Sequence, residues 1–247
     1  MDRYGPETYG ELIADVYDEW HAHMDPAATV DVLASLAGDG PVLELGIGTG
    51  RVAIPLAARG LEVHGVDASP AMVEHMRAKP GGGGIGVTFG HLADVPVERS
   101  FTLVYIVFNT FFALLTQDDQ VRCFANVARR LEPGGRFSLE GFVPDVARFD
   151  RGQRVHVMSL DVDRVRLDVS QHRPLEQRVD AQHVVISGGG GVRLVPVALR
   201  YAWPSELDLM ARLAGLRLRH RWGGWNREPF DDDSQRHVSV YEKPATS

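Results

Sequence analysis

Pro41-Val-Leu-Glu-Leu-Gly-Ile-Gly-Thr-Gly-Arg51 is the stretch that decides how this chain folds. Residues 42–45 form a short apolar run that predicts a buried strand, and a G-x-G-x-G turn follows directly at Gly46, Gly48 and Gly50. Residues 51–59 then predict a helix that ends at Gly60. Glycine alone readily allows turns with positive φ and a close approach of the backbone to a ligand. This order of strand, glycine turn and helix therefore predicts a site for a nucleotide-like ligand.

The next predicted strand, residues 61–66, leads into Asp67, a carboxylate placed to accept hydrogen bonds from both hydroxyls of a ribose. The glycine spacing differs from the G-x-G-x-x-G of dinucleotide-binding folds, and Glu44 stands two residues before the first glycine. This pattern resembles motif I of the class I S-adenosylmethionine (SAM) methyltransferases. Residues 67–72 are similar to the segment after that family's second strand, and Leu-Glu-Pro-Gly-Gly-Arg-Phe at 131–137 resembles the turn before its fifth strand. The three segments occur in the family's order.

Composition is that of an ordinary globular protein, with 247 residues, 44% hydrophobic and 24% charged. The net charge of −7 provides no overall attraction to nucleic acid or to an anionic membrane. The one dense basic cluster, residues 217–221, alternates with leucine and is typical of the solvated face of a strand.

Cysteine and hydropathy patterns limit the cellular setting. Cys123 is the only cysteine, which excludes an internal disulfide and a cysteine-rich metal site. Residues 1–6 lack the pattern of a signal peptide, and the most apolar run, residues 101–115, is too short for a membrane span. We therefore expect a cytoplasmic protein.

The rest of the chain alternates predicted helices and strands, which indicates a parallel, doubly wound sheet. Helices are predicted at residues 9–20, 27–36, 69–79, 117–131 and 204–214, and strands at 85–89, 101–108, 136–140, 216–222 and 236–242. The glycine-rich residues 80–84 are expected to form a mobile loop. Four further strands, at 155–160, 164–171, 177–187 and 192–203, are separated by turn signals and predict an antiparallel meander.

The expected fold class is α/β, with a Rossmann-like, doubly wound, mostly parallel seven-stranded sheet and an antiparallel β insertion after the fifth strand. The predicted division is an N-terminal helical cap (1–40), a SAM-binding Rossmann-like core (41–152), the insertion as a lid or dimer element (153–203), and the last helix with the final two strands (204–247).

The resemblance implies S-adenosylmethionine as the cofactor, S-adenosylhomocysteine as its product, and no metal. The cofactor site that it implies consists of Glu44, Gly46, Ile47, Gly48, Gly50, Arg51, Asp67, Ala68, Met72, His91, Leu92, Phe108, Asn109 and Tyr17. The glycines would lie under the methionine part, Asp67 would bind the ribose, and Ala68 and Met72 would pack on the adenine. His91 replaces the aspartate usual in the family's third motif, which leaves the adenine contact open among His91, the Leu92 backbone and Asp94.

Several of these residues also have a purely structural interpretation. Glu44 is nearly as well explained as a partner of the helix N-terminus, and Met72 and Tyr17 equally well as core residues. Asn109 is expected to contact the methionine part of SAM and to face the substrate, with a helix N-cap as the alternative for Asn109 and Thr110.

The acceptor side is less well defined by the sequence. Five aromatic residues are candidates for the walls of an acceptor pocket, with a place in the core as the alternative: Trp20, Phe112, Phe142, Trp222 and Trp225. No catalytic base is identified; the weak candidates are His183, His172, Glu140 and Tyr17, and each histidine alone is more often a surface or hydrogen-bonded residue. Asn-Pro-Pro-Tyr, a cysteine-nucleophile motif and a divalent-metal cluster are all missing from the sequence.

The predicted function is methyl transfer from SAM to a small-molecule acceptor by in-line displacement. The pattern resembles bacterial N-methyltransferases of amino sugars and natural products, so N-methylation is favoured, while O-methylation or C-methylation of a ring such as indole stays open. The alternatives are a SAM- or nucleotide-binding module without transferase activity and an NAD-dependent oxidoreductase, against which the glycine spacing argues. The expected partners are a small molecule and, through the insertion, a second copy of the chain, but neither nucleic acid nor membrane.

Overall fold

The computed structural model describes residues 4–245. Residues 1–3 and 246–247 lie outside the described residues. Residues 1–3 are part of the segment 1–6, in which the sequence shows no signal-peptide pattern. Within the described part of the chain, no helix combines the length and the hydropathy needed to cross a membrane.

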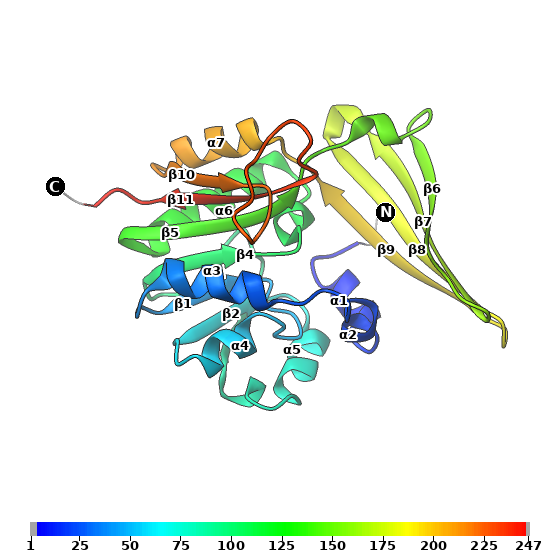
Figure 1. Ribbon diagram of the computed structural model, residues 1–247, viewed down its shortest axis with the longest axis horizontal. Coiled ribbons are helices and arrows are strands. Elements are labelled where there is room, and N and C mark those ends of the chain that lie inside the picture. The colour runs from blue at the N-terminus through cyan, green and yellow to red at the C-terminus, as the bar shows by residue number, and fades with distance from the viewer. Residues whose placement is uncertain (1–3, 246–247) are drawn as a thin grey trace.

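A seven-stranded sheet forms the centre of the molecule, with its strands in the order β10-β11-β5-β4-β1-β2-β3 (Figure 1). The strands are β1 (Val42–Leu45), β2 (Val63–Asp67), β3 (Gly86–Phe89), β4 (Phe101–Ile106), β5 (Leu131–Phe142), β10 (Arg217–Trp222) and β11 (Arg236–Glu242). The pairs among β1 to β5 are parallel, and β11 is antiparallel to both β5 and β10. The predicted α/β fold class is confirmed.

Helices cover both faces of this sheet, as its continuous apolar strands require. One face packs against α3 (Ala27–Ala37), α4 (Ala53–Ala58) and α5 (Pro70–Arg77), and the other against α6 (Gln117–Arg130) and α7 (Pro204–Leu213). Local sequence fixes where two of these helices begin. Ser69 accepts a hydrogen bond from the Met72 N–H (3.2 Å) with Pro70 at the first helical position, and Thr116 accepts one from the Asp119 N–H (3.1 Å).

The insertion is a separate four-stranded antiparallel sheet with the order β6-β7-β8-β9. Its strands are β6 (Gln153–Leu160), β7 (Arg164–Arg173), β8 (Arg178–Ser187) and β9 (Val192–Arg200), joined as a meander (Figure 1). It extends beyond the seven-stranded sheet on the side where the carboxyl ends of the parallel strands lie.

The N-terminal segment lies between the two sheets and differs from its prediction. One helix was expected over residues 9–20, but the structure has two short helices, α1 (Thr8–Ile13) and α2 (Tyr17–Trp20), with a break at Val16 (φ −120°, ψ −3°). Leu12, which the helical periodicity had placed on the inner face, is 40% exposed. Trp20 packs under the Arg166 guanidinium of β7, and Tyr17 packs against the same apolar cluster as Trp20.

The predicted mobile loop at residues 80–84 is instead a short 3-10 turn at Gly82–Gly84. Gly82 is buried, and a Cβ there would collide with the Met76 carbonyl oxygen of α5. Gly82 therefore allows close packing of the turn against α5.

Candidate active site

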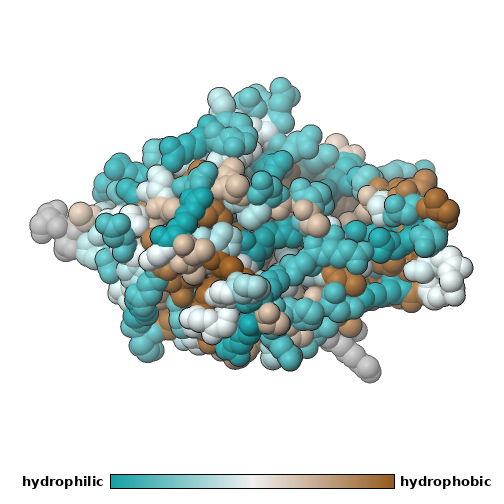
Figure 2. All heavy atoms as spheres, turned by 60° about the horizontal axis from the view of Figure 1, so that its bottom comes forward, coloured by the Kyte–Doolittle hydropathy of each residue, from teal (hydrophilic) through white to brown (hydrophobic). Residues whose placement is uncertain are grey.

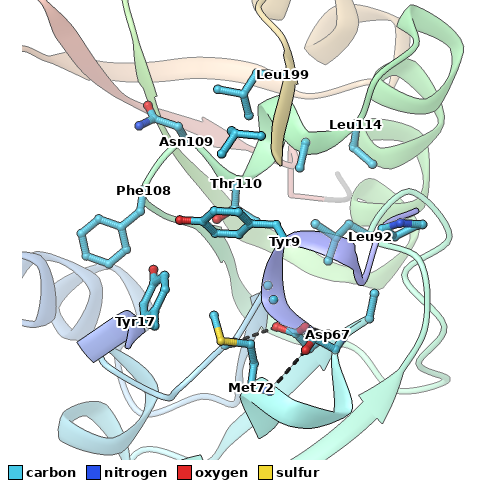
Figure 3. A pocket seen from close by; sticks show the side chains of 18 of the residues that line it. Tyr9, Tyr17, Asp67, Met72, Leu92, Phe108, Asn109, Thr110, Leu114 and Leu199 are labelled. Atoms are coloured by element: carbon cyan, nitrogen blue, oxygen red, sulfur yellow. Dashed lines mark hydrogen bonds between the residues drawn. The ribbon is translucent and has the colours of Figure 1, made fainter. Parts of the chain in front are cut away.

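A cavity of about 500 Å³ opens where the carboxyl ends of the parallel strands meet the N-terminal segment and β9 (Figure 3). In doubly wound sheets this edge is the usual ligand site. Ten of the fourteen residues predicted for the cofactor line it: Gly46, Gly48, Asp67, Ala68, Met72, His91, Leu92, Phe108, Asn109 and Tyr17.

The glycine turn forms the floor at one end of the cavity. Gly46, Gly48 and Gly50 all have positive φ (81°, 52° and 75°), which explains why glycine is needed at each position. A Cβ built on Gly48 would meet only Met72 Cε at 3.6 Å and the Gly46 carbonyl oxygen at 4.0 Å. The space above Gly48 is therefore open, as the close approach of a ligand requires.

Asp67 lies beside this floor, and its carboxylate is oriented by backbone N–H groups. Oδ2 accepts from Gly48 (2.7 Å) and Oδ1 from Ser69 (2.8 Å), as the dashed lines in Figure 3 show. Burial raises the pKa of Asp67, although the N–H groups of Ser69 and Gly48 act in the opposite direction. Each oxygen keeps accepting capacity for a hydroxyl donor, so the carboxylate fits a ribose diol.

The four remaining predicted cofactor residues do not line the cavity. Ile47 packs under the loop against Gly65, and Gly50 lies against Met76. Glu44 is buried beneath the loop, where the Tyr105 hydroxyl donates to its Oε2 (2.9 Å) and burial raises its pKa to about 8. Arg51 lies outside the cavity lining, against the rings of Tyr17 and Phe108.

The Arg51 guanidinium lies between two aromatic rings that do line the cavity, at 5.7 Å from the centroid of Tyr17 and 5.2 Å from that of Phe108. It also donates a long hydrogen bond to the Met24 carbonyl (3.4 Å). Its position stiffens the wall formed by the two rings.

The opposite end of the cavity is lined by apolar side chains and by two tyrosine hydroxyl-bearing rings. Figure 3 shows Tyr9 and Tyr17 projecting inward from the N-terminal segment, with Leu114 and Leu199 across from them. Burial raises the pKa of both Tyr9 and Tyr17, so the two phenols are neutral at physiological pH. Sequence reasoning missed Tyr9 as a cavity residue, although it lies on the same apolar stripe as Tyr17, which was the available signal.

The ends of β4 and β5 supply the third wall. The Glu140 carboxylate, on a residue only 6% exposed, accepts from the Phe108 N–H through Oε2 (2.8 Å). Asn109 Oδ1 in turn accepts from the Phe142 N–H (2.8 Å), so its side-chain oxygen is not the N-cap of the following turn. Phe108 and Asn109 both have left-handed backbone (φ 54° and 65°).

Of the weak base candidates, the structure brings Glu140 and Tyr17 to the cavity and leaves two histidines on the second sheet. His183 faces Asp168 (3.5 Å), and His172 Nε2 lies 2.9 Å from the Tyr201 hydroxyl with its ring stacked on Phe149. Each has a polar neighbour there, although among residues 4–245 the buried Nδ1 of His183 has no hydrogen-bond partner.

Of the predicted acceptor walls, Phe142 alone lines the cavity. The other four are held elsewhere by packing. Phe112 is fully buried against Phe142, Trp20 lies under Arg166, Trp222 stacks on His220, and Trp225 belongs to the core beneath the sheet. The aromatic character of these residues alone could not show which of them line the cavity and which belong to the hydrophobic core.

Comparison with known proteins agrees with this geometry. A methyltransferase domain model matches residues 42–135. The CcbJ methyltransferase from Streptomyces caelestis is 44% identical with a TM-score of 0.92, over 98% of this chain and 100% of that chain. Cypemycin N-terminal methyltransferase from a Streptomyces species is 27% identical over 245 residues, which are 96% of this chain and 98% of the relative.

The SAM-bound amino pentose methyltransferase CalS10 from Micromonospora echinaspora shares the fold, with 21% identity and a TM-score of 0.66 over 91% of each chain. Fold, glycine loop and full-length similarity therefore agree. The chain belongs to the class I methyltransferases and takes its methyl group from S-adenosylmethionine.

Proposed function

We propose that this enzyme methylates an amine nitrogen of a small molecule bound in the cavity. The observation that carries the proposal is Glu140, a buried carboxylate on the cavity wall. Among residues 4–245 its hydrogen-bond partner is the Phe108 N–H, and no cationic side chain lies within ion-pair distance. Arg236, which also lines the cavity, is exposed at its rim. A buried carboxylate without a cation is costly, and an ammonium acceptor would offset that cost.

The names of the relatives support a nitrogen acceptor without identifying it. The cypemycin enzyme is named for methylation of an N-terminus, and a sugar N-methyltransferase from a Streptoalloteichus species has the same fold. We therefore favour a primary or secondary amine carried on a small natural product or amino sugar.

In this proposal the donor half holds SAM through residues that fit it. Gly46 and Gly48 lie under the methionine part, Asp67 accepts from the ribose hydroxyls, and Met72 with Leu92 flanks the adenine. SAM supplies a methyl group on a sulfonium, which is electrophilic without further activation.

The chain's own residues then act on the acceptor. The Glu140 oxygen that does not bind Phe108 attracts the ammonium and takes the proton that the nitrogen must lose before its lone pair is available. The neutral phenols of Tyr9 and Tyr17 orient the amine by hydrogen bonds, and the apolar walls at Leu114 and Leu199 exclude water.

The proposal is tested by supplying SAM with a ¹³C-labelled methyl group and pairs of acceptors that differ only in bearing an amine or a hydroxyl. We expect the label on nitrogen, read by NMR and mass spectrometry. Label on oxygen or carbon would contradict the proposal.

Glu140→Gln should lower amine turnover by about 100-fold, since a positioned base contributes rate factors of this order, while SAM affinity stays unchanged. Glu74→Gln, an exposed position on α5, is the matched control and should behave like the wild type. Wild-type turnover by Glu140→Gln would rule out the assigned role.

We also propose that the enzyme is a homodimer through the outer face of the second sheet. Two rows of side chains, Val157-Leu167-Val184-Leu194 and Leu160-Val165-Ile186-Val192, cross all four strands on this face. Many of these side chains are exposed, including Leu160, Val192 and Leu194. Figure 2 shows apolar surface gathered at the end of the molecule that this sheet forms. An exposed apolar face of this kind is typical of an interface.

A further inference from the structure

We infer that Asn109 is a positioning residue, which together with Glu140 holds the Phe108–Thr110 turn against the glycine loop of the donor site. Two crossed hydrogen bonds tie the ends of β4 and β5 together. Glu140 on β5 accepts from the Phe108 N–H, and Asn109 after β4 accepts from the Phe142 N–H, both at 2.8 Å. Each bond joins a side chain of one strand end to the backbone of the other, so a shift of one end alone would break a bond.

The turn needs such a clamp because its backbone is strained. Phe108 and Asn109 are consecutive non-glycine residues at φ 54° and 65°. This region is unfavourable for a side chain that bears a Cβ, and least so for asparagine. Strained backbone persists only where surrounding contacts fix it, and the two crossed bonds provide that restraint.

The strained turn is in direct contact with the donor site. A Cβ built on Gly46, the first glycine of the loop, would collide with the Thr110 side chain. The Phe108 ring lines the cavity and lies 5.2 Å from the Arg51 guanidinium. A shift of the turn therefore changes both the floor and one wall of the space in which the methionine part of SAM is expected.

This assignment differs from the direct contact with SAM that the sequence suggests for Asn109. Its side-chain oxygen accepts from the Phe142 N–H, so the side chain is held as part of the turn. Asn109 then acts on the donor through Phe108 and Thr110. The inference does not depend on which atom of the acceptor is methylated.

Calorimetric titration of the full-length protein with SAM and with S-adenosylhomocysteine tests the inference. Asn109→Ala loses the hydrogen bond to Phe142 and increases the backbone strain, because alanine tolerates φ 65° less well than asparagine. We therefore expect about tenfold weaker binding, the equivalent of one left-handed residue's penalty. Asn109→Gly loses the side chain but tolerates φ 65°, and should bind several-fold more tightly than the alanine variant. Asn226→Ala, at an exposed asparagine, is the matched control and should bind like the wild type.

A second pair of variants supplies a conservative rescue. Glu140→Gln keeps an oxygen that can accept from Phe108 and should retain wild-type SAM affinity, whereas Glu140→Ala should lose affinity as Asn109→Ala does. Equal losses in the alanine and glycine variants of Asn109 would indicate direct contact and overturn the inference, and so would unchanged SAM affinity in Glu140→Ala. If Asn109→Ala fails to fold, the SAM affinities of Glu140→Gln, Glu140→Ala and Asn109→Gly test the inference instead. Failure of the proposed amine methylation would show instead in acceptor turnover.

Discussion

Glu44 is a residue whose protonation is coupled to folding. It is fully buried beside Tyr105, and burial raises its pKa from 4.5 to about 8 although Tyr105 donates to it. The folded state therefore binds this proton more tightly than the unfolded chain does. Its contribution to stability is fully present below pH 4.5 and is lost as the pH rises through about 8.

Between about pH 5 and about pH 8, we expect the free energy of unfolding to fall by on the order of 3 kcal/mol more in the wild type than in Glu44→Gln, which cannot ionise. Urea unfolding of both proteins at the two pH values measures this difference. Parallel pH dependence of the two proteins would show that Glu44 is ionised in the folded state.

Single residues were predictable from the sequence where the signal was local. The positive-φ glycines and Asp67 lie within one strand-turn-helix-strand unit, so the motif itself places them together. The sequence also singled out Asn109 and Glu140, but their hydrogen bonds were not predictable, because the partners lie 33 and 32 positions away along the chain. A hydrogen bond of that kind becomes visible only when the two strands are paired.

At the scale of elements, α2 is fastened to the glycine loop by Asp18. The carboxylate accepts from the Thr49 hydroxyl (2.7 Å) and pairs with Lys79 (2.6 Å), and Thr49 is part of the loop. Both charged side chains are partly exposed, so the ion pair contributes no more than about 1 kcal/mol to stability. Its consequence should be kinetic instead, because α2 carries Tyr17 over the cavity.

We expect Asp18→Ala to speed SAM dissociation by about fivefold with little change in melting temperature, since it releases the cover without opening the core. Stopped-flow displacement of SAM measures the rate. Asp31→Ala, which breaks an exposed pair with Arg59 outside the cavity lining, is the control. An unchanged dissociation rate in Asp18→Ala would mean that α2 does not limit release.

The sequence predicted most elements because turn residues and periodicity mark them, and the four strands of the insertion are an example. It failed at residues 9–20, where helical periodicity continues through a segment that the structure breaks at Val16. The break depends on two neighbours distant in sequence, the glycine loop bound by Asp18 and the second sheet bound by Asp15 through Arg193. Tertiary contacts outweigh local helix propensity there.

At the scale of the whole molecule, the second sheet has one face that the monomer leaves uncovered. Its inner face packs on α1 and α2 through Val185 and Val195, while the outer face carries the exposed apolar rows. The alternation that predicted the strands could not show which face would be covered, because that depends on where the N-terminal segment lies.

Light scattering coupled to size exclusion should give twice the chain mass of 27.2 kDa. The double variant Val157→Asp with Leu194→Asp should be monomeric, because burying two carboxylates in an apolar interface is costly. Val162→Asp, at a fully exposed hairpin tip, serves as the control. A wild-type protein that elutes as a monomer at micromolar concentration would contradict the proposed dimer.

The donor site at Asp67 is the central claim, and calorimetric titration of SAM into the wild type and Asp67→Ala tests it most directly. We expect the wild type to bind SAM and the variant to bind at least about 30-fold more weakly, because two hydrogen bonds to a charged carboxylate are lost. Asp67→Asn, which keeps one accepting oxygen, should fall between them, and thermal unfolding checks that each variant is folded. Binding of SAM by Asp67→Ala with wild-type affinity would contradict the donor site described here.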